Sequence, residues 1–280
     1  MTNFVKMRTL EDALIKFGGQ AGRSVYKHLS DGGIRDFEDC TTENIGEWMA
    51  DMKDKVAANS LKTYMSIFKH TIKQYTDTGR VPCGNLDGKF TVRGETAQKI
   101  YLTEDELDRL SNIATKSDRE RVVLYTFLIG ARTGMRISDA RQVTMANVHD
   151  GYLTYVSQKT SIEATIPVSE QVQRYIAALS GMTTTITLVN YEKSIRRLCE
   201  RAGINDVVTV YRGGVAATGP KYSFVTSHTA RATFCTILAQ KGVPVIDIMT
   251  LAGHTSPDMT ARYIVRSTPK LNNDALKFLQ

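Results

Sequence analysis

With 280 residues, of which 42% are hydrophobic and 23% charged, the chain is long and apolar enough for one large core or two smaller ones, which argues against a disordered protein. Its longest apolar stretches are far shorter than the roughly 20 residues that cross a bilayer, which argues against a membrane protein. Its four cysteines are widely spaced without a C-x-x-C pair, which argues against a disulfide framework and a zinc knuckle. The formal net charge of +7 fits a polyanionic partner, and the excess lies beyond residue 95, where 22 Lys and Arg stand against 16 Asp and Glu, compared with 14 against 13 before it.

The first part of the chain, residues 1–82, is expected to form a helical domain. In NSLKTYMSIFKHTIKQY, apolar side chains recur every three or four positions, which predicts a helix with one buried stripe. The stripe contains Leu61, Tyr64, Met65, Phe68, Ile72 and Tyr75. Lys62, Lys69 and Lys73 lie on the other faces of this helix and are interpreted as a solvated surface.

Residues 83–99 are interpreted as a linker, because this glycine-rich passage keeps no hydrophobic period. A second domain is expected over residues 100–265. In it, Thr103 followed by three acidic residues predicts an N-cap and a helix to about residue 114, since the helix dipole favours negative charge in the first turn. VVLYTFLIGA is apolar on all sides, as expected of a central helix, and Gly134 is expected to mark a break after it.

The segment GYLTYVSQKTSIEATIPV changes to an alternating pattern. Tyr152 and Thr154 fall on one side of an extended chain, and Leu153 and Tyr155 on the other. This alternation predicts two strands joined by a turn near residues 159–161. The whole chain is therefore expected to be mainly α with a small β-sheet (α+β).

Three short helices are predicted near the C-terminal end. The first, HTARATFCTILAQK, is expected to begin with Ser227 as its N-cap. The second, VPVIDIMTLA, ends at Gly253, directly before His254. The third, SPDMTARYI, is expected to carry Tyr263 about two turns along.

These helices bring together residue types that suit one chemistry. His228 and Arg231 are three residues apart and project from the same side of a first helical turn, where unpaired N–H groups favour an anion. Residues 207–246 contain no Asp or Glu that would repel it. A tyrosine has a pKa of about 10 and needs help as a nucleophile, which histidine gives by moving a proton while arginines neutralise phosphate oxygens. The pattern predicts metal-free covalent cleavage of a nucleic-acid strand, because a two-metal nuclease would require several carboxylates.

Three motifs carry a resemblance to a known family: TGMRISD at 133–139, HTAR at 228–231 and LAGHTSPDMTARYI at 251–264. In order and spacing they resemble the arginine box, the H-x-x-R box and the L-G-H to tyrosine box of the tyrosine recombinases of the phage integrase family. The resemblance implies a helical core-binding (DNA-binding) domain over 1–82 and a tyrosine-recombinase catalytic domain over 100–265. It also implies a C-terminal tail, 266–280, exchanged between subunits, with a tail folded back on its own domain as the alternative.

The resemblance further implies roles for the residues that match these motifs. Tyr263 would attack the scissile phosphate to form a 3′-phosphotyrosine and release a 5′-hydroxyl. Arg136 and Arg231 would hold the non-bridging oxygens. His228 would assist proton transfer from the tyrosine, and His254 would hydrogen-bond the phosphate.

Two further residues match less distinctive positions. Lys159, in the predicted turn, would protonate the leaving 5′-oxygen, although lysines are common in turns. Asp139 would orient the site as a supporting residue, where many family members carry glutamate. An ion pair between Asp139 and Arg136 is the structural alternative for both of those side chains.

The function that the resemblance implies is a site-specific DNA recombinase, in particular a phage or mobile-element integrase. Double-stranded DNA is the expected partner, bound by a homo-tetramer on two DNA sites with no cofactor or metal, and accessory DNA-bending or directionality proteins are further expected partners. About 95 residues precede the catalytic domain, which is expected to leave no room for the arm-binding domain of larger integrases, so an invertase or resolvase of the same family stays open. A type IB topoisomerase, which uses a similar residue set, and a noncatalytic DNA-binding relative are the rival functions.

The expected location is the cytoplasm of a bacterial or phage-infected cell. The N-terminal sequence MTNFVKMRTLEDAL carries acidic residues where a signal peptide would have an uninterrupted apolar run.

Overall fold

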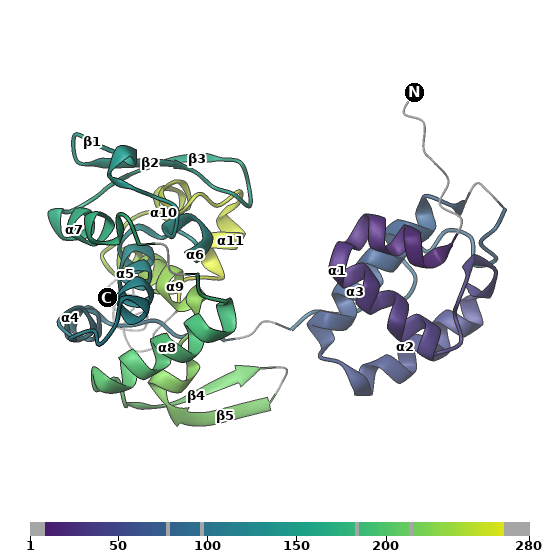
Figure 1. Cartoon of the computed structure of the whole chain (residues 1–280). Coiled ribbons are helices and arrows are strands. Elements are labelled where there is room, and N and C mark those ends of the chain that lie inside the picture. Colours follow the sequence, from purple (N-terminus) through teal and green to yellow (C-terminus); the bar gives the residue numbers. More distant parts are fainter. Residues whose placement is uncertain (1–8, 77–78, 96–97, 183–184, 213–214, 266–280) are drawn as a thin grey trace, which may run out of the picture. The chain divides into compact units, whose positions relative to one another are not determined.

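The computed structural model of the chain describes residues 9–76, 79–95, 98–182, 185–212 and 215–265. The chain divides into two compact units, one of residues 1–97 with 212–215 and the other of residues 98–211 with 216–280 (Figure 1). The predicted fold class, mainly helical with small antiparallel sheets, is confirmed. In the part of the chain that is described, no helix is at once long enough and apolar enough to cross a bilayer.

The first unit is a cluster of helices around one apolar core. Its elements are α1 (Leu10–Asp31), the 3-10 turn η1 (Phe37–Asp39), α2 (Thr42–Lys55) and α3 (Ala58–Lys73). Helix α3 packs against α1 and α2, and its predicted stripe is confirmed, since Leu61, Met65 and Phe68 are buried. Lys62 and Lys73 are exposed, as their interpretation as a solvated surface requires, whereas Lys69 is half-buried and donates to the backbone oxygen of Lys89.

The segment interpreted as a linker has irregular structure over residues 83–95, yet part of it belongs to the first unit's core. Cys83 and Leu86 are buried there. Because these side chains follow no period, the sequence pattern does not reveal their burial. The domain limits expected from the sequence stay a prediction, and the tail at 266–280 lies outside the described residues.

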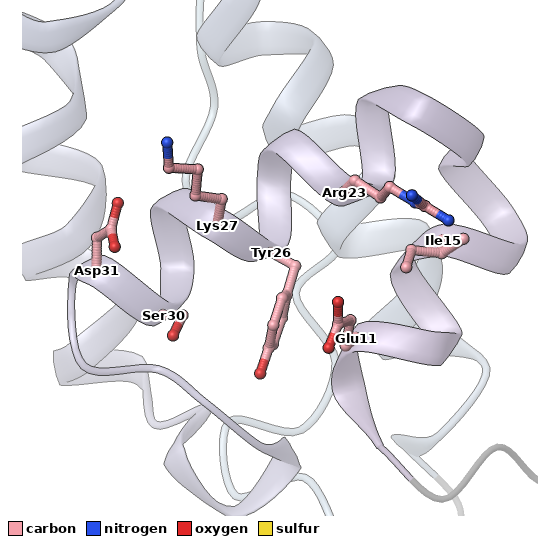
Figure 2. Close-up of a pocket in the computed structure, with 7 residues that line it drawn as sticks. All are labelled: Glu11, Ile15, Arg23, Tyr26, Lys27, Ser30 and Asp31. Atoms are coloured by element: carbon pink, nitrogen blue, oxygen red, sulfur yellow. The ribbon is translucent and has the colours of Figure 1, made fainter.

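A hollow of about 480 Å³ opens along α1. Figure 2 shows Tyr26 directed to the same side of the helix as Glu11, whereas Lys27 extends in the opposite direction. The hollow is lined by side chains of α1, and it contains none of the residues that the sequence analysis selects for a functional site.

The second unit holds the three C-terminal helices, the three-stranded sheet and most of the β4–β5 pair. Its elements are α4 (Glu104–Ser111), α5 (Asp118–Thr133), α6 (Ile137–Ala140), η3 (Met145–Asn147), β1 (Val148–His149), β2 (Tyr152–Val156), β3 (Glu163–Pro167), α7 (Glu170–Leu179), α8 (Leu188–Arg201), β4 (Val207–Arg212), β5 (Val215–Pro220), η4 (Lys221–Phe224), α9 (Ser227–Gln240), α10 (Val245–Ala252) and α11 (Pro257–Ala261). Thr103 caps α4 with its side chain, as predicted.

Helix α5 is the central helix of this unit, as its uniformly apolar sequence predicts. It packs against α7, α8 and α9, and most of its side chains from Val122 onward are buried. Gly134 ends α5 with a positive φ of 73°. A Cβ at this position would lie 2.5 Å from the ring of Phe234, so both the backbone conformation and the close approach of α9 require glycine.

The predicted strand pair is confirmed as β2 and β3, which run antiparallel, with β1 on the other edge of β2. Leu153 pairs with Ile166 and Tyr155 with Ala164, and all four side chains face the core. A second antiparallel pair, β4 and β5, was not predicted. Its sequence did carry a signal, since two runs rich in β-branched residues flank a Gly-Gly pair.

Candidate active site

The last three helices position most of the candidate residues. Helix α9 begins one residue from the predicted place, because Thr226 and not Ser227 is the N-cap, in a capping box with Thr229. Gly253 ends α10 in the left-handed conformation, with φ 62°, as predicted. Tyr263 does not lie within the third helix as expected, because α11 ends at Ala261 and the tyrosine follows in a turn.

Arg231 is the centre of the site. It is only 1% exposed, and within the described part of the chain no carboxylate pairs with it. Its Nε donates a hydrogen bond to His254 Nε2 at 2.9 Å, and its Nη1 donates to the backbone oxygen of Gly134 at 2.7 Å. Its Nη2 is buried and has no hydrogen-bond partner among the described residues. A buried donor of this kind is costly unless it is satisfied, so it marks a place where an acceptor can bind.

His254 is buried beside Arg231, with 5% of its surface exposed. The Arg231 Nε–H can only donate, so His254 Nε2 accepts and its Nδ1 carries the proton toward Thr260 Oγ1, 2.9 Å away. Burial, followed by the positive charges of Arg231, Arg136 and Lys99, lowers the pKa of His254 to about 3. His254 is therefore neutral at pH 7, and both of its ring nitrogens are engaged within the protein.

Tyr263 contacts both candidate histidines. Its hydroxyl lies 3.1 Å from His228 Nδ1, and its ring stacks on His254 with centroids 5.1 Å apart. The Arg231 guanidinium carbon lies 5.6 Å from the centre of the same ring. His228 is exposed at the surface of the site. Its partial burial is the largest cause that lowers its pKa, and four nearby positive charges lower it further. A neutral His228 is able to accept the phenol proton.

Arg136 and Asp139 anchor the β2–β3 hairpin and do not form the ion pair considered as their structural alternative. Arg136 Nη1 donates to Ser157 Oγ at 3.0 Å, and the Asp139 Oδ1 accepts from the Gln158 backbone N–H at 3.1 Å. Asp139 is buried, and its Oδ2 has no hydrogen-bond partner within the described residues. Both side chains are therefore hydrogen-bonded to Ser157 and Gln158, directly before Lys159 in the turn.

Lys159 is exposed, as is His228, but unlike His228 it has no hydrogen-bond contact with Tyr263. In the described part of the chain it makes no hydrogen bond or ion pair with the other five predicted catalytic residues. Its charge nevertheless contributes to lowering the pKa of His228. The structure thus brings Arg136, Arg231, both histidines and Tyr263 close together and leaves Lys159 on a hairpin at the edge of the group.

Two residues that the sequence analysis missed also contact Tyr263. Lys99, in the segment interpreted as a linker, has its Nζ 3.2 Å from the centre of the Tyr263 ring. Thr236 of α9 donates its hydroxyl to the Tyr263 backbone oxygen at 3.3 Å and accepts from the Val265 N–H at 2.9 Å. Neither residue belongs to a motif or a periodic pattern that singles it out, so only the folded chain reveals it.

The group has the parts of a nucleophilic site for an anionic ester. The phenol of Tyr263 lies next to a neutral imidazole. Two guanidinium groups lie close together, since burial first and then the positive charge of Arg136 lower the pKa of Arg231. Among the described residues, no group of three or more His, Cys, Asp or Glu could hold a metal ion. The expectation that the reaction needs no metal stays a prediction.

Comparisons with known proteins fit this geometry. The model of the phage integrase family matches residues 100–268. Tyrosine recombinase XerC of Syntrophus aciditrophicus (strain SB) is 24% identical over 232 residues, which cover 79% of this chain and 72% of the relative. The transposase from transposon Tn916 of Enterococcus faecalis is 23% identical over 268 residues, and the chain spans 65% of its length.

The solved structures include a lambda integrase tetramer bound to a Holliday junction, which matches with a TM-score of 0.63 and 18% identity. That match covers 93% of this chain and 78% of the integrase chain.

Proposed function

The chain belongs to the phage integrase family, and on this premise we propose that it is a site-specific DNA recombinase that cuts and rejoins DNA through a 3′-phosphotyrosine intermediate. The resemblance on which the sequence analysis relied is confirmed by the family match. The similarity to a transposase of Tn916 favours an integrase of a phage or mobile element.

In the proposed reaction, the Tyr263 oxygen attacks the scissile phosphorus while His228 accepts the phenol proton. The bond from phosphorus to the 5′-oxygen breaks, and Lys159 gives that oxygen a proton, so that a 5′-hydroxyl and a 3′-phosphotyrosine result. Arg136 and Arg231 hold the non-bridging oxygens and neutralise the charge that grows in the transition state. Rejoining is the reverse of these steps, with a 5′-hydroxyl as the nucleophile.

His254 has a different proposed role from the one that the family resemblance implies. Both of its ring nitrogens are engaged, with Arg231 and Thr260, so in this conformation it offers no free donor to a phosphate. It instead orients the Arg231 guanidinium and supports the ring of Tyr263. Asp139 supports the site by fixing the backbone at Gln158, next to Lys159.

One observation carries the proposal. The buried Arg231 Nη2 has no partner in the described chain, and it belongs to a guanidinium that lies against the Tyr263 ring while the Tyr263 hydroxyl meets a neutral histidine. A phosphate oxygen would satisfy that donor and bring its phosphorus to the phenol. Such a pre-formed anion site beside a nucleophile serves a covalent reaction better than simple DNA binding.

The proposed partner is double-stranded DNA, bound by a homo-tetramer across two DNA sites. The lambda integrase whose chain this one resembles is a tetramer bound to a Holliday junction, which supports the proposal. Accessory DNA-bending or directionality proteins are proposed as further partners. The cytoplasm of a bacterial or phage-infected cell is the proposed location, because the DNA substrate lies there. An invertase or resolvase role is the alternative within the family.

The test is covalent capture of DNA by the purified full chain. Wild-type protein is incubated with supercoiled plasmids that carry fragments of its source genome, in buffer with EDTA, and adducts are separated on denaturing gels. We expect adducts that Tyr263→Phe abolishes while its DNA affinity is unchanged. Cleavage by Tyr263→Phe would refute the assignment of the nucleophile. Plasmid relaxation without strand exchange would indicate a topoisomerase, and no adduct on any DNA would indicate a noncatalytic DNA-binding protein.

A further inference from the structure

We propose that Lys99 is a positioning residue for the nucleophile, whose ammonium group holds the Tyr263 ring in the orientation needed for attack. This inference rests on the proposed function and adds a residue that none of the three sequence motifs contains. Lys99 lies at the start of the second unit, more than 150 residues before Tyr263 in the sequence.

The geometry is a close cation–π contact. The Lys99 Nζ lies 3.2 Å from the centre of the Tyr263 ring, which is well inside the roughly 6 Å over which such contacts are attractive. The hydroxyl of the same tyrosine is bound by His228, and the ring stacks on His254. Lys99 therefore contacts the face of the ring, while the reacting oxygen is contacted by His228.

The position of Lys99 is electrostatically unfavourable by itself. A lysine side chain normally keeps its ammonium in water, but this one is half-buried among the positive charges of Arg231 and Arg262. Within the described part of the chain no carboxylate forms an ion pair with it. Burial, more than these charges, lowers the pKa of Lys99 to about 8. A half-buried charge without an ion-pair partner is costly in free energy and is typical of functional sites. This one contacts the ring of Tyr263.

Tyr263 needs an additional contact of this kind. It follows the end of α11 in a turn, where its backbone N–H donates to the Thr260 oxygen at 2.8 Å but no further helical turn supports its side chain. Thr236 holds its backbone oxygen, and the ring is restrained only by side chains. A cation on the ring face limits the orientations of the phenol before DNA arrives, which reduces the entropy that must be lost on the way to the transition state.

The contact predicts a specific pH dependence. The charged or titratable groups that act on Lys99 or respond to it are Arg231 and Cys235 on α9, Arg262 and Tyr263 after α11, His228 and His254. Both histidines have lowered pKa values and are neutral above pH 7, and the arginines stay charged. Between pH 7 and 9, Lys99 is thus the group whose loss of a proton would release the ring, whereas an arginine in its place would stay charged.

The first test needs no DNA. Protein with ¹³C-labelled tyrosine rings is compared by NMR with Lys99→Met and Lys99→Arg, and Tyr263→Phe assigns the resonance. We expect the wild-type Tyr263 signal to move in a step near pH 8 and the Lys99→Arg signal to show no such step. Lys99→Met should move the signal away from its wild-type position at pH 7 and should remove the step near pH 8. A signal that is the same in wild type and Lys99→Met would overturn the proposal.

The second test measures the rate of covalent adduct formation at saturating DNA, using a plasmid fragment that wild-type protein cleaves. Lys99→Met should slow this step roughly tenfold, the size expected for a partly desolvated cation–π contact. Its DNA affinity and the salt dependence of that affinity should stay unchanged. Lys99→Arg should restore the rate, and the ratio of the Lys99→Arg rate to the wild-type rate should rise above pH 8.

Two outcomes of the second test would assign Lys99 another role and so overturn the proposal. Weaker DNA affinity with a smaller salt slope and an unchanged saturated rate would make Lys99 a phosphate contact. Recovery of Lys99→Met on DNA with a sulfur in place of the leaving 5′-oxygen would make it a proton donor, because a thiolate leaves without protonation. If wild-type protein forms no adduct, the proposed function fails, and the NMR comparison still decides whether Lys99 holds the ring.

Discussion

The two ends of the proposed site are built in opposite ways. At one end, Arg231 and His254 are buried and hydrogen-bonded to each other, and Tyr263 packs on both. At the other end, Lys159 is exposed on the turn of the β2–β3 hairpin and has no hydrogen-bond or ion-pair partner within the described residues. Contacts within the folded chain hold Tyr263 at the first end, whereas no hydrogen bond or ion pair in the described chain holds the Lys159 side chain at the second.

The buried end has a cost in stability. A guanidinium that is 1% exposed and lacks a carboxylate partner loses hydration that two hydrogen bonds only partly replace. A carboxylate would satisfy Arg231 better, but it would also repel a phosphate. The proposed phosphate ligand therefore accounts for the absence of Asp and Glu from residues 207–246, which the stability of the fold alone does not favour.

Arg231→Lys tests whether the buried end depends on the shape of the guanidinium as well as its charge. Lysine keeps the positive charge and three N–H donors, but they lie on one compact ammonium, which cannot reach His254, Gly134 and a phosphate oxygen at the spacing that the planar guanidinium spans. We expect adduct formation to fall by roughly 10³-fold or more, within the range known for arginines that stabilise phosphoryl transfer. The measurement is the single-turnover rate at saturating DNA.

A matched control is Arg132→Lys, because Arg132 lies next to the first arginine box and forms an ion pair with Asp108, at 3.1 Å. That variant should keep the wild-type rate. If adduct formation by Arg231→Lys stayed within tenfold of the wild-type rate, the planar guanidinium of Arg231 would not be essential.

Lys159→Met tests the exposed end. Because the side chain is exposed and makes no hydrogen bond or ion pair in the described part of the chain, the thermal stability of the variant should equal that of the wild type. Loss of a proton donor should slow cleavage by roughly 10²-fold. DNA with a sulfur in place of the leaving 5′-oxygen should restore the rate, and an equal defect on both substrates would remove Lys159 from that role.

The same contrast explains which parts of the site the sequence could predict. Gly134 and Gly253 were identified because helix ends need a left-handed residue, and the predicted positions match the observed φ values. His228 and Arg231 were placed on one side of a helix by their spacing, and both do meet Tyr263. Local rules of this kind are visible in a short stretch of sequence.

The rest depended on contacts between distant segments. Lys99 lies in a stretch without any period, and Thr236 is one of several threonines on α9, so neither had a local signal. The partner of Arg136 is Ser157 across the fold, and not its sequence neighbour Asp139, which the sequence offered as the structural alternative. Tyr263 was assigned to a helix because its pattern continues that of α11, although the chain leaves the helix after Ala261.

Thr236→Val, with the smallest expected effect, tests how the nucleophile is attached to the buried end. Thr236 is fully buried, and its hydroxyl links α9 to the chain on both sides of Ile264. Valine has nearly the same shape but leaves the Tyr263 carbonyl and the Val265 N–H without that partner, which should lower the free energy of unfolding by about 1 kcal/mol. The adduct rate should fall a few-fold, since Lys99 and His254 still hold the ring.

Thr126 provides the control, because its buried hydroxyl has no hydrogen-bond partner among the described residues. Thr126→Val should therefore leave the adduct rate unchanged and leave the free energy of unfolding unchanged or slightly raised. Equal effects of the two substitutions in urea unfolding would mean that the Thr236 hydroxyl does not fix Tyr263, and the buried end would then owe its order to side-chain packing alone.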